Sequence, residues 1–234
     1  EMRQQGRTGL VTYVTAGDPD LERTARILRA LDRGGADVIE IGVPFSDPLA
    51  DGPVIQRSSD RALRRGVTLP RVLELVARIR ERSQLPIVLF SYLNPLLQLG
   101  LERLCVEAPA AGVDGLLVTD LPPEEAGELL PEARAAQLDT IFLAAPTSPD
   151  ERLALVSQAS RGFVYAVSRI GVTGEQHSLS GDAAPLVARL RALTRGPVVL
   201  GFGISTPEQV AAAVEVADGA VVYSALVLYL EGHP

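Results

Sequence analysis

The segment DVIEIGVPFSDPLADGP, residues 37–53, places a carboxylate inside an apolar run and then continues into a loop rich in proline and aspartate. Its first part, VIEIGV at 38–43, is apolar on both faces except for Glu40. A continuous apolar run of this kind is typical of a parallel strand that is covered on both sides. Alternate side chains of a barrel strand point inward, and Glu40 shares its parity with Val38 and Gly42. The segment therefore predicts a parallel strand with a buried acid near its C-terminal end.

Similar apolar runs recur along the 234 residues, with helical patterns between them. We expect strands at 10–15, 38–43, 87–91, 115–119, 140–144, 163–168, 198–201 and 220–223. Eight strands that alternate with helices in this length favour an α/β fold, a single-domain (β/α)₈ TIM barrel over residues 1–234. The rival is an open doubly wound sheet. That sheet usually has a G-x-G-x-x-G turn after its first strand, whereas this chain has TAGD at 15–18.

Three proline motifs predict where helices begin: Asp18-Pro19-Asp20, Ser148-Pro149-Asp150 and Thr206-Pro207-Glu208. Proline is favoured at the first helical position, and the residue before it can cap the helix through its side chain. We therefore expect Asp18, Ser148 and Thr206 to be N-caps. Thr68 is a further expected N-cap, before a helical pattern that starts at Leu69.

Composition narrows the class of protein. The formal net charge is −7 and the sequence pI is about 5.0, which makes nucleic acid a poor partner because its phosphates require a basic surface. The sequence has no run of about 18 or more apolar residues, so no membrane span is predicted. The single cysteine, Cys105, excludes an internal disulfide and fits a cytoplasmic location.

The ionisable residues point to carboxylate chemistry. All 22 basic residues are arginine, so the chain cannot form a Schiff base through lysine. Its two histidines are far apart in sequence and have no nearby cysteine, so no metal site is expected. A glutamate buried among Val and Ile would have a raised pKa and could exchange protons near neutral pH. The alternative is that Glu40 points outward and pairs with an arginine.

Loops after three of the predicted strands hold further candidates. Asp47 and Asp51 follow the strand of Glu40; they are candidates for a second catalytic carboxylate, although both lie in ordinary turn motifs. The glycine-rich loop at 169–182 predicts a mobile lid, or else a tolerated surface insertion. GFGIS at 201–205 and VVYS at 221–224 end the last two strands, where barrels often bind phosphate.

Seven motifs occur in the order and spacing of one family: YVTAGDPD, IEIGVPFSDPLADGPVIQ, SYLNPL, GVDGLLVTDLPPEE, IFLAAPTSPDERL, GFVYAVSRIGVTG and GFGISTPEQV. Over nearly its whole length the chain resembles the alpha subunit of tryptophan synthase. The resemblance implies a (β/α)₈ barrel that cleaves indole-3-glycerol phosphate to indole and glyceraldehyde 3-phosphate by carboxylate acid/base catalysis. It implies no cofactor in this chain. It also implies that indole passes to a pyridoxal-phosphate beta subunit, for L-tryptophan synthesis in a heterotetramer of two alpha and two beta subunits.

The resemblance also assigns roles to residues. The expected catalytic residues are Glu40, Asp51 and Tyr165. Positions around the substrate are Tyr13, Phe90, Tyr92, Leu117 and the lid residue Thr173, which would contact Asp51. Phosphate-binding positions are Gly174, Gly203, Tyr223 and Ser224. Asp47 matches a position that faces the beta subunit, and no metal site is implied.

The chain departs from the family pattern near its last strand. Tyr223 stands where the family usually has glycine, and Leu228 where a basic residue is usual. We expect Tyr223 to keep a negative φ and its ring to lie beside the phosphate or the following helix start. Compared with the family, the chain begins late and ends early, at Pro234. Two other functions stay open: another phosphate-binding barrel, such as a sugar-phosphate isomerase or epimerase, or a weakened subunit that mainly binds and activates a beta partner.

Overall fold

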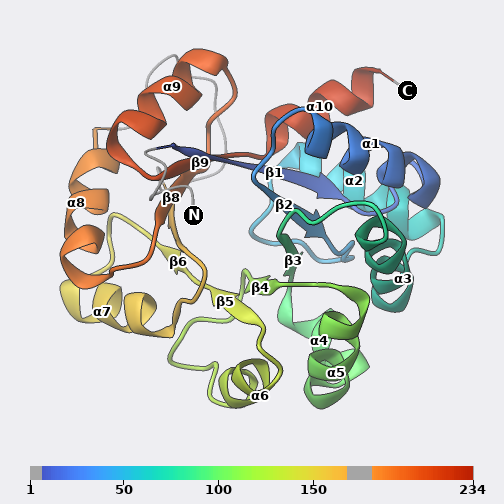
Figure 1. Ribbon diagram of the computed structural model, residues 1–234, viewed down its shortest axis with the longest axis horizontal. Helices are drawn as coiled ribbons and strands as arrows, with labels where there is room; N and C mark the ends of the chain where they lie inside the picture. Colours follow the sequence, from blue (N-terminus) through green and yellow to red (C-terminus); the bar gives the residue numbers. More distant parts are fainter. Residues whose placement is uncertain (1–6, 168–180, 234) are drawn as a thin grey trace.

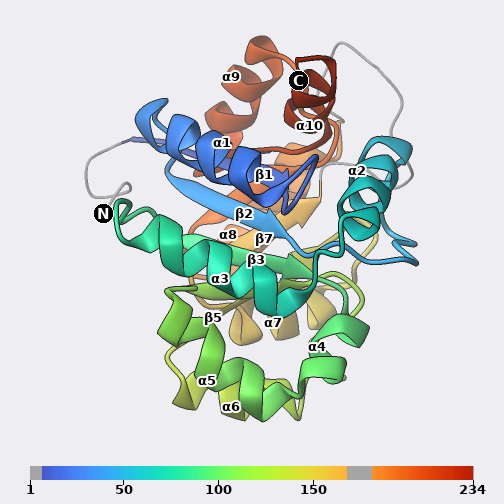
Figure 2. The same ribbon diagram turned by 90° about the vertical axis from the view of Figure 1, so that its right-hand side faces the viewer.

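The computed structural model describes residues 7–167 and 181–233, and the strands in this part form a barrel surrounded by helices (Figures 1 and 2). The strands are β1 (Gly9–Thr15), β2 (Val38–Gly42), β3 (Ile87–Ser91), β4 (Gly115–Val118), β5 (Asp139–Ile141), β6 (Leu143–Ala144), β7 (Val164–Val167), β8 (Val198–Gly201) and β9 (Gly219–Val222). The helices are α1 (Leu21–Arg33), α2 (Pro53–Arg64), α3 (Leu69–Arg80), α4 (Leu93–Leu99), α5 (Leu101–Ala111), α6 (Leu129–Ala135), α7 (Asp150–Ala159), α8 (Ala183–Leu193), α9 (Pro207–Val216) and α10 (Ser224–Gly232).

The strands are all parallel, in the order β5-β4-β3-β2-β1-β9-β8-β7-β6. Only Phe142 separates β5 from β6, so these two form one interrupted strand that pairs with β4 at its start and with β7 at its end. The break arises where the Phe142 N–H donates to the Ser160 hydroxyl (3.3 Å) instead of to a strand. The eight-stranded barrel predicted from the sequence is therefore confirmed, and the open doubly wound sheet is not.

Apolar side chains pack in two layers. The inner layer fills the barrel with alternate residues of the strands, including Val11, Tyr13, Val88, Phe90, Leu117, Ile141, Tyr165, Val199 and Val221. The outer layer lies between the strands and the helices and includes Ile39, Ile41, Leu89 and Leu116. Glu40 stands opposite Tyr13 on one side and Val88 on the other, so it shares their inward face. The inward orientation predicted for Glu40 is confirmed.

Two of the predicted N-caps are correct in position and two are wrong. Thr206 caps α9 in a capping box with Gln209, and Thr68 stands at the N-cap of α3 without a side-chain hydrogen bond. The N-cap of α1 is Asp20 rather than Asp18, because Arg61 and Ser58 bind the Asp18 carboxylate. Pro149 rather than Ser148 precedes α7, since the Ser148 N–H closes a turn onto the Ala145 carbonyl (3.0 Å).

A charged cluster fixes the last helix to the barrel. Arg61 bonds both Asp18 (2.7 Å) and Glu231 of α10 (2.7 Å), and Arg57 bonds Glu231 at 2.8 Å. Helix α10 accordingly lies beside α2 (Figure 1). Because α2 follows the loop that carries Asp51, and α10 follows Tyr223, the cluster holds these two segments next to each other at the barrel mouth.

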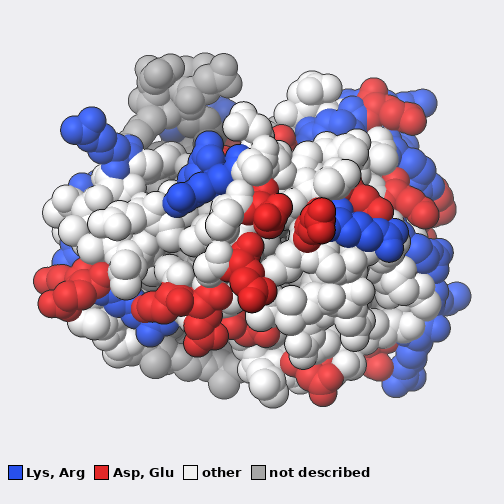
Figure 3. All heavy atoms as spheres, turned by 90° about the horizontal axis from the view of Figure 1, so that it is seen from below, with Lys and Arg blue, Asp and Glu red and all other residues white. Residues whose placement is uncertain are grey.

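The surface is mixed in charge. On the face drawn in Figure 3, acidic and arginine side chains are interspersed, in keeping with the formal net charge of −7. No helix in the described ranges 7–167 and 181–233 is long and apolar enough to cross a membrane.

Candidate active site

Glu40 is an ionisable residue that lies fully buried inside the barrel. Its side chain is 0% exposed, and neither carboxyl oxygen has a hydrogen-bond partner among the residues that the structure describes. Burial disfavours the charged form and raises the pKa of Glu40 from 4.5 to about 8. At neutral pH the group is therefore mostly a neutral carboxylic acid, poised to donate a proton and then to take one back.

Two buried tyrosines extend inward around Glu40, and glycines on the neighbouring strands make room for them. A Cβ at Gly42 would lie 2.0 Å from the Tyr13 hydroxyl oxygen, and a Cβ at Gly201 would lie 2.3 Å from that of Tyr165. Burial raises the pKa of Tyr165 well above 10, and the charge of Glu40 adds to the shift. The Tyr165 phenol therefore stays protonated and can act as a hydrogen-bond donor.

Asp51 is held at the mouth of the barrel by two phenols. Tyr92 donates to its Oδ2 (3.1 Å) and Tyr223 donates to its Oδ1 (2.8 Å). The Ala50 N–H donates to the Tyr92 oxygen (2.9 Å), and the Gln56 amide donates to the Asp51 carbonyl (2.8 Å). Burial raises the pKa of Asp51, while the bonds from the two phenols lower it. The loop thus fixes a carboxylate that both tyrosines stabilise.

Aromatic rings enclose the space near these acids. The Tyr13 ring lies 3.9 Å from that of Tyr223 and 5.3 Å from that of Phe90, centroid to centroid. Phe202 stacks on Tyr223 at 6.4 Å and meets Tyr165 edge-on at 5.8 Å. The pKa of Tyr13 is raised by burial and then by the charges of Asp51 and Glu40. The Tyr13 ring therefore lies within the electrostatic influence of both acids.

The structure brings most of the predicted site residues together at this end of the barrel. Glu40, Tyr13, Phe90, Leu117 and Tyr165 are buried inside it, and Asp51 and Tyr92 are buried at its mouth. Asp47 lies apart from them, exposed near the tip of the β2–α2 loop and beside Leu49, which is 93% exposed. Thr173, Gly174 and most of the predicted lid at 169–182 lie outside the described residues.

The expected phosphate positions follow the last two strands. Gly203 has φ of +82°, and Ser224 is the first residue of α10. Tyr223 is the N-cap of that helix with φ of −114°, so the predicted negative φ is confirmed. We expected its ring beside the phosphate or the helix start; instead the ring packs on Tyr13 and its hydroxyl bonds Asp51, because Tyr223 shares the inward parity of Val221.

Sequence reasoning missed one residue of the enclosure. Phe202 has φ of +69°, a conformation that is costly for a residue with a Cβ. The strained backbone carries its ring between those of Tyr165 and Tyr223. The signal available in the sequence was an aromatic residue between two glycines at the end of a strand.

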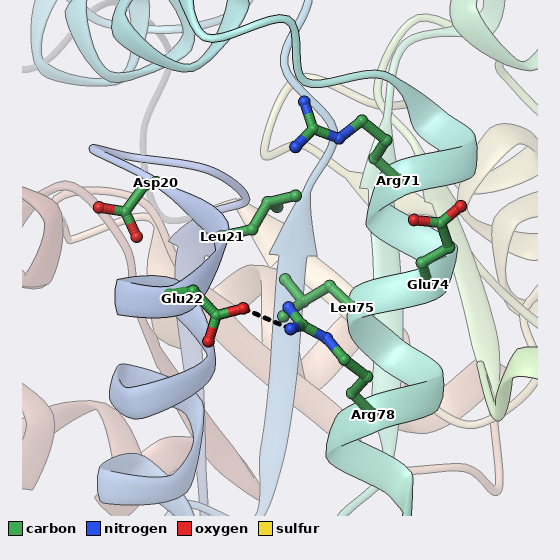
Figure 4. A pocket seen from close by; sticks show the side chains of 7 residues that line it. All are labelled: Asp20, Leu21, Glu22, Arg71, Glu74, Leu75 and Arg78. Carbon is green, nitrogen blue, oxygen red and sulfur yellow. Dashed lines mark hydrogen bonds and ion pairs between the residues drawn. The ribbon is translucent and has the colours of Figure 1, made fainter.

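A separate pocket of about 540 Å³ lies on the outer surface between α1 and α3 (Figure 4). It is lined by Asp20, Leu21, Glu22, Arg71, Glu74, Leu75 and Arg78. Glu22 and Arg78 already form an ion pair across it, and it contains none of the predicted site residues. Within ranges 7–167 and 181–233, no group of three or more His, Cys, Asp or Glu side chains could hold a metal ion.

Comparison with known proteins gives a consistent result. The family model for the tryptophan synthase alpha chain matches residues 1–234. The tryptophan synthase alpha chain of Geobacter sp. (strain M21) is 54% identical over 98% of this chain and 86% of its own length. That of Solibacter usitatus is 52% identical over the same shares.

Solved structures agree in fold. A chain of the tryptophan synthase complex from Pyrococcus furiosus has a TM-score of 0.87 at 42% identity, over 96% of this chain and 90% of its own. A chain of Mycobacterium tuberculosis tryptophan synthase has a TM-score of 0.92 at 41% identity, over 98% and 88% respectively.

Glu40→Gln should stabilise the fold increasingly as pH rises. The pKa of Glu40 is about 8 in the folded protein and 4.5 as an ordinary glutamate, so between these values the folded state holds a proton that the unfolded chain has lost. The wild-type free energy of unfolding should therefore fall, relative to the variant, by up to about 1.4 kcal/mol per pH unit across that window. Urea unfolding of both proteins from pH 4.5 to 8 measures this difference. A difference that does not change with pH would contradict it.

Proposed function

The chain belongs to the tryptophan synthase alpha chain family, and from this premise we propose that Glu40 and Asp51 are the carboxylates that carry its reaction. The protein is a lyase of tryptophan biosynthesis, which cleaves indole-3-glycerol phosphate to indole and glyceraldehyde 3-phosphate. The observation that carries the assignment is the pair of buried acids in one aromatic enclosure: Glu40 with no hydrogen-bond partner among the described residues, and Asp51 held by two phenols.

Glu40 supplies the proton transfers. Cleavage requires a proton at C3 of the indole ring and removal of the proton from the adjacent side-chain hydroxyl. A carboxylic acid with a pKa of about 8 can give the first proton at neutral pH, and the carboxylate that results can accept the second. The carbon–carbon bond then breaks as the aldehyde forms, its electron pair returns to the indole ring, and Glu40 ends the cycle protonated as it began.

Asp51 stabilises the charge that develops on the indole nitrogen. Protonation of C3 converts the ring to an indolenine, in which the N–H is acidic. A carboxylate that accepts this hydrogen bond stabilises the charged intermediate. The two phenols support this role, because they lower the pKa of Asp51 against the effect of burial and so favour its ionised form.

The remaining site residues bind the substrate. Tyr165 stays protonated beside Glu40 and donates a hydrogen bond in the site. Tyr13, Phe90, Tyr92 and Leu117 form the apolar and aromatic walls for the indole ring. Because the start of a helix attracts anions, the N-terminus of α10 at Ser224, the Tyr223 backbone and Gly203 bind the phosphate. The predicted contributions of Thr173 and Gly174 stay predictions.

The partner and the setting of the reaction follow from the family. The similar M. tuberculosis structure is of tryptophan synthase, and the similar P. furiosus structure is of the tryptophan synthase complex. We propose that residues 1–234 form one barrel domain that pairs with a beta subunit in the cytoplasm, in a heterotetramer of two alpha and two beta subunits. Indole passes to the beta subunit, where pyridoxal phosphate supports its joining to serine. The alpha chain itself needs no cofactor for acid/base cleavage.

Glu40→Gln should lower kcat for cleavage by roughly 10²–10⁴-fold, because the amide fills the same space but cannot transfer protons. Asp51→Asn should also be severely impaired, since the neutral amide cannot stabilise a developing positive charge. Indole release from indole-3-glycerol phosphate measures both. Glu102→Gln, an exposed glutamate on α5, is the matched control and should retain wild-type activity. Near-normal turnover in Glu40→Gln would make Glu40 a structural residue.

The pH profile of the wild type should show an alkaline limb that belongs to Glu40. The first step uses its protonated form, so kcat/KM should be level near neutral pH and fall above about pH 8, the raised pKa of this group. Steady-state cleavage across the pH range gives the profile. A fall that begins near 4.5, the pKa of an ordinary glutamate, would mean that Glu40 does not act as the acid.

Asp47→Ala should weaken the interaction with the beta subunit. Asp47 is exposed on the loop that carries Asp51 four residues later, so a partner that binds there acts on a catalytic carboxylate. Titration of the beta subunit with each alpha protein gives the affinity and the stimulation of cleavage. Glu81→Ala removes an exposed acid at the C-terminal end of α3, on the opposite face of the barrel, and should behave as wild type. Equal binding and equal stimulation by Asp47→Ala would refute the assignment.

A further inference from the structure

Tyr223 makes contacts that resemble those of a bound aromatic ligand. Its hydroxyl donates to Asp51 Oδ1 at 2.8 Å. Its ring lies 3.9 Å from Tyr13, 5.4 Å from Phe90 and 6.4 Å from Phe202, centroid to centroid. The side chain therefore fills part of the aromatic enclosure and uses one oxygen of the carboxylate at its mouth.

The indole ring of the substrate needs the same partners. Indole is a planar aromatic ring system with a single N–H donor. The Tyr223 side chain is likewise a planar aromatic ring with a single O–H donor. Resting on the function proposed above, we infer that Tyr223 is an intramolecular ligand of the indole subsite, which the substrate must displace from Asp51 and from the Tyr13 ring. Tyr223 thereby sets the affinity of the site for indole compounds.

The two oxygens of Asp51 are not equivalent in this exchange. Oδ2 is bound by Tyr92, whose own oxygen is fixed by the Ala50 N–H at 2.9 Å within the same loop. Oδ1 is bound by Tyr223, which is half-buried, whereas Tyr92 is 5% exposed. Displacement of Tyr223 frees Oδ1 for the indole N–H, while Tyr92 keeps the carboxylate in place.

The movement required is confined to a side chain. Tyr223 is the N-cap of α10, and Arg57 and Arg61 hold Glu231 at the other end of that helix against α2. These ion pairs hold α10, whose start is proposed to bind phosphate, against α2. Rotation of the phenol out of the enclosure leaves that start unchanged.

Indole binding tests the inference directly. The chain contains no tryptophan, so the fluorescence of added indole, excited beyond tyrosine absorption, reports binding without a protein background. Tyr223→Phe keeps the ring and loses the bond to Asp51, and Tyr223→Gly removes both. We expect the Kd for indole to fall several-fold in Tyr223→Phe and roughly tenfold or more in Tyr223→Gly, since a competing hydrogen bond to a charged group has been removed.

The matched control is Tyr92→Phe, which removes the other phenol from the same carboxylate. It should not tighten indole binding, because Tyr92 holds Asp51 without occupying the ring site. In cleavage assays KM for indole-3-glycerol phosphate should fall in both Tyr223 variants. Circular dichroism and thermal unfolding establish that each variant is folded.

Two results would overturn the inference alone while leaving the proposed function intact. In the first, the wild type cleaves the substrate, but the folded Tyr223 variants have a Kd for indole that is unchanged or higher. The other is a large loss of kcat in Tyr223→Phe without tighter binding, which would make Tyr223 a positioning residue for Asp51. Absence of cleavage by the wild type, with or without the beta subunit, would remove the proposed function itself and the inference with it.

Discussion

The interior of the barrel must accommodate a carboxyl group that has no hydrogen-bond partner among the described residues, and this requirement shapes the site. A charged Glu40 in that place would be costly, so the protein keeps the group neutral through desolvation instead of pairing it with a base. The ion pairs seen among the described residues involve surface arginines, as in Arg61–Asp18 and Arg80–Asp114, and Glu40 takes part in none of them. The raised pKa of Glu40 lowers the stability of the fold at neutral pH, and the same raised pKa allows Glu40 to transfer protons there.

The features carried by strands could be predicted from the sequence because they depend on local periodicity. The apolar runs gave the strands, and the two-residue repeat gave the inward face of Glu40, which its register with Tyr13 and Val88 confirms. The break at Phe142 was not predictable, since it depends on a hydroxyl of Ser160 from the next connection. The wrong caps at Asp18 and Ser148 have a similar cause, because distant or turn contacts take up the groups that would have capped the helices.

The features carried by loops depended on closure of the barrel. Asp51 and Tyr223 are 172 residues apart in sequence and meet only because β9 pairs with β1 beside β2. A reading of local motifs could identify Asp51 as a candidate acid but could not find the two phenols that bind it. The same limit applies to Phe202, whose ring reaches the enclosure because the residue has a positive φ, a conformation that residues with a Cβ seldom adopt.

Tyr13 and Tyr165, two of the inward tyrosines, stand in the same geometric relation to a glycine on a neighbouring strand. Tyr13 stands opposite Glu40 and Tyr165 stands opposite Val199; in each case the glycine that makes room lies two residues further along the neighbouring strand, at Gly42 and Gly201. Each tyrosine ring thus occupies the space that a side chain at the glycine of the neighbouring strand would fill. A mutation that adds volume at either glycine therefore requires a smaller residue at its tyrosine. The constraint has one direction: the tyrosine can be replaced by a smaller residue alone, whereas the glycine can be replaced only after its tyrosine has become smaller.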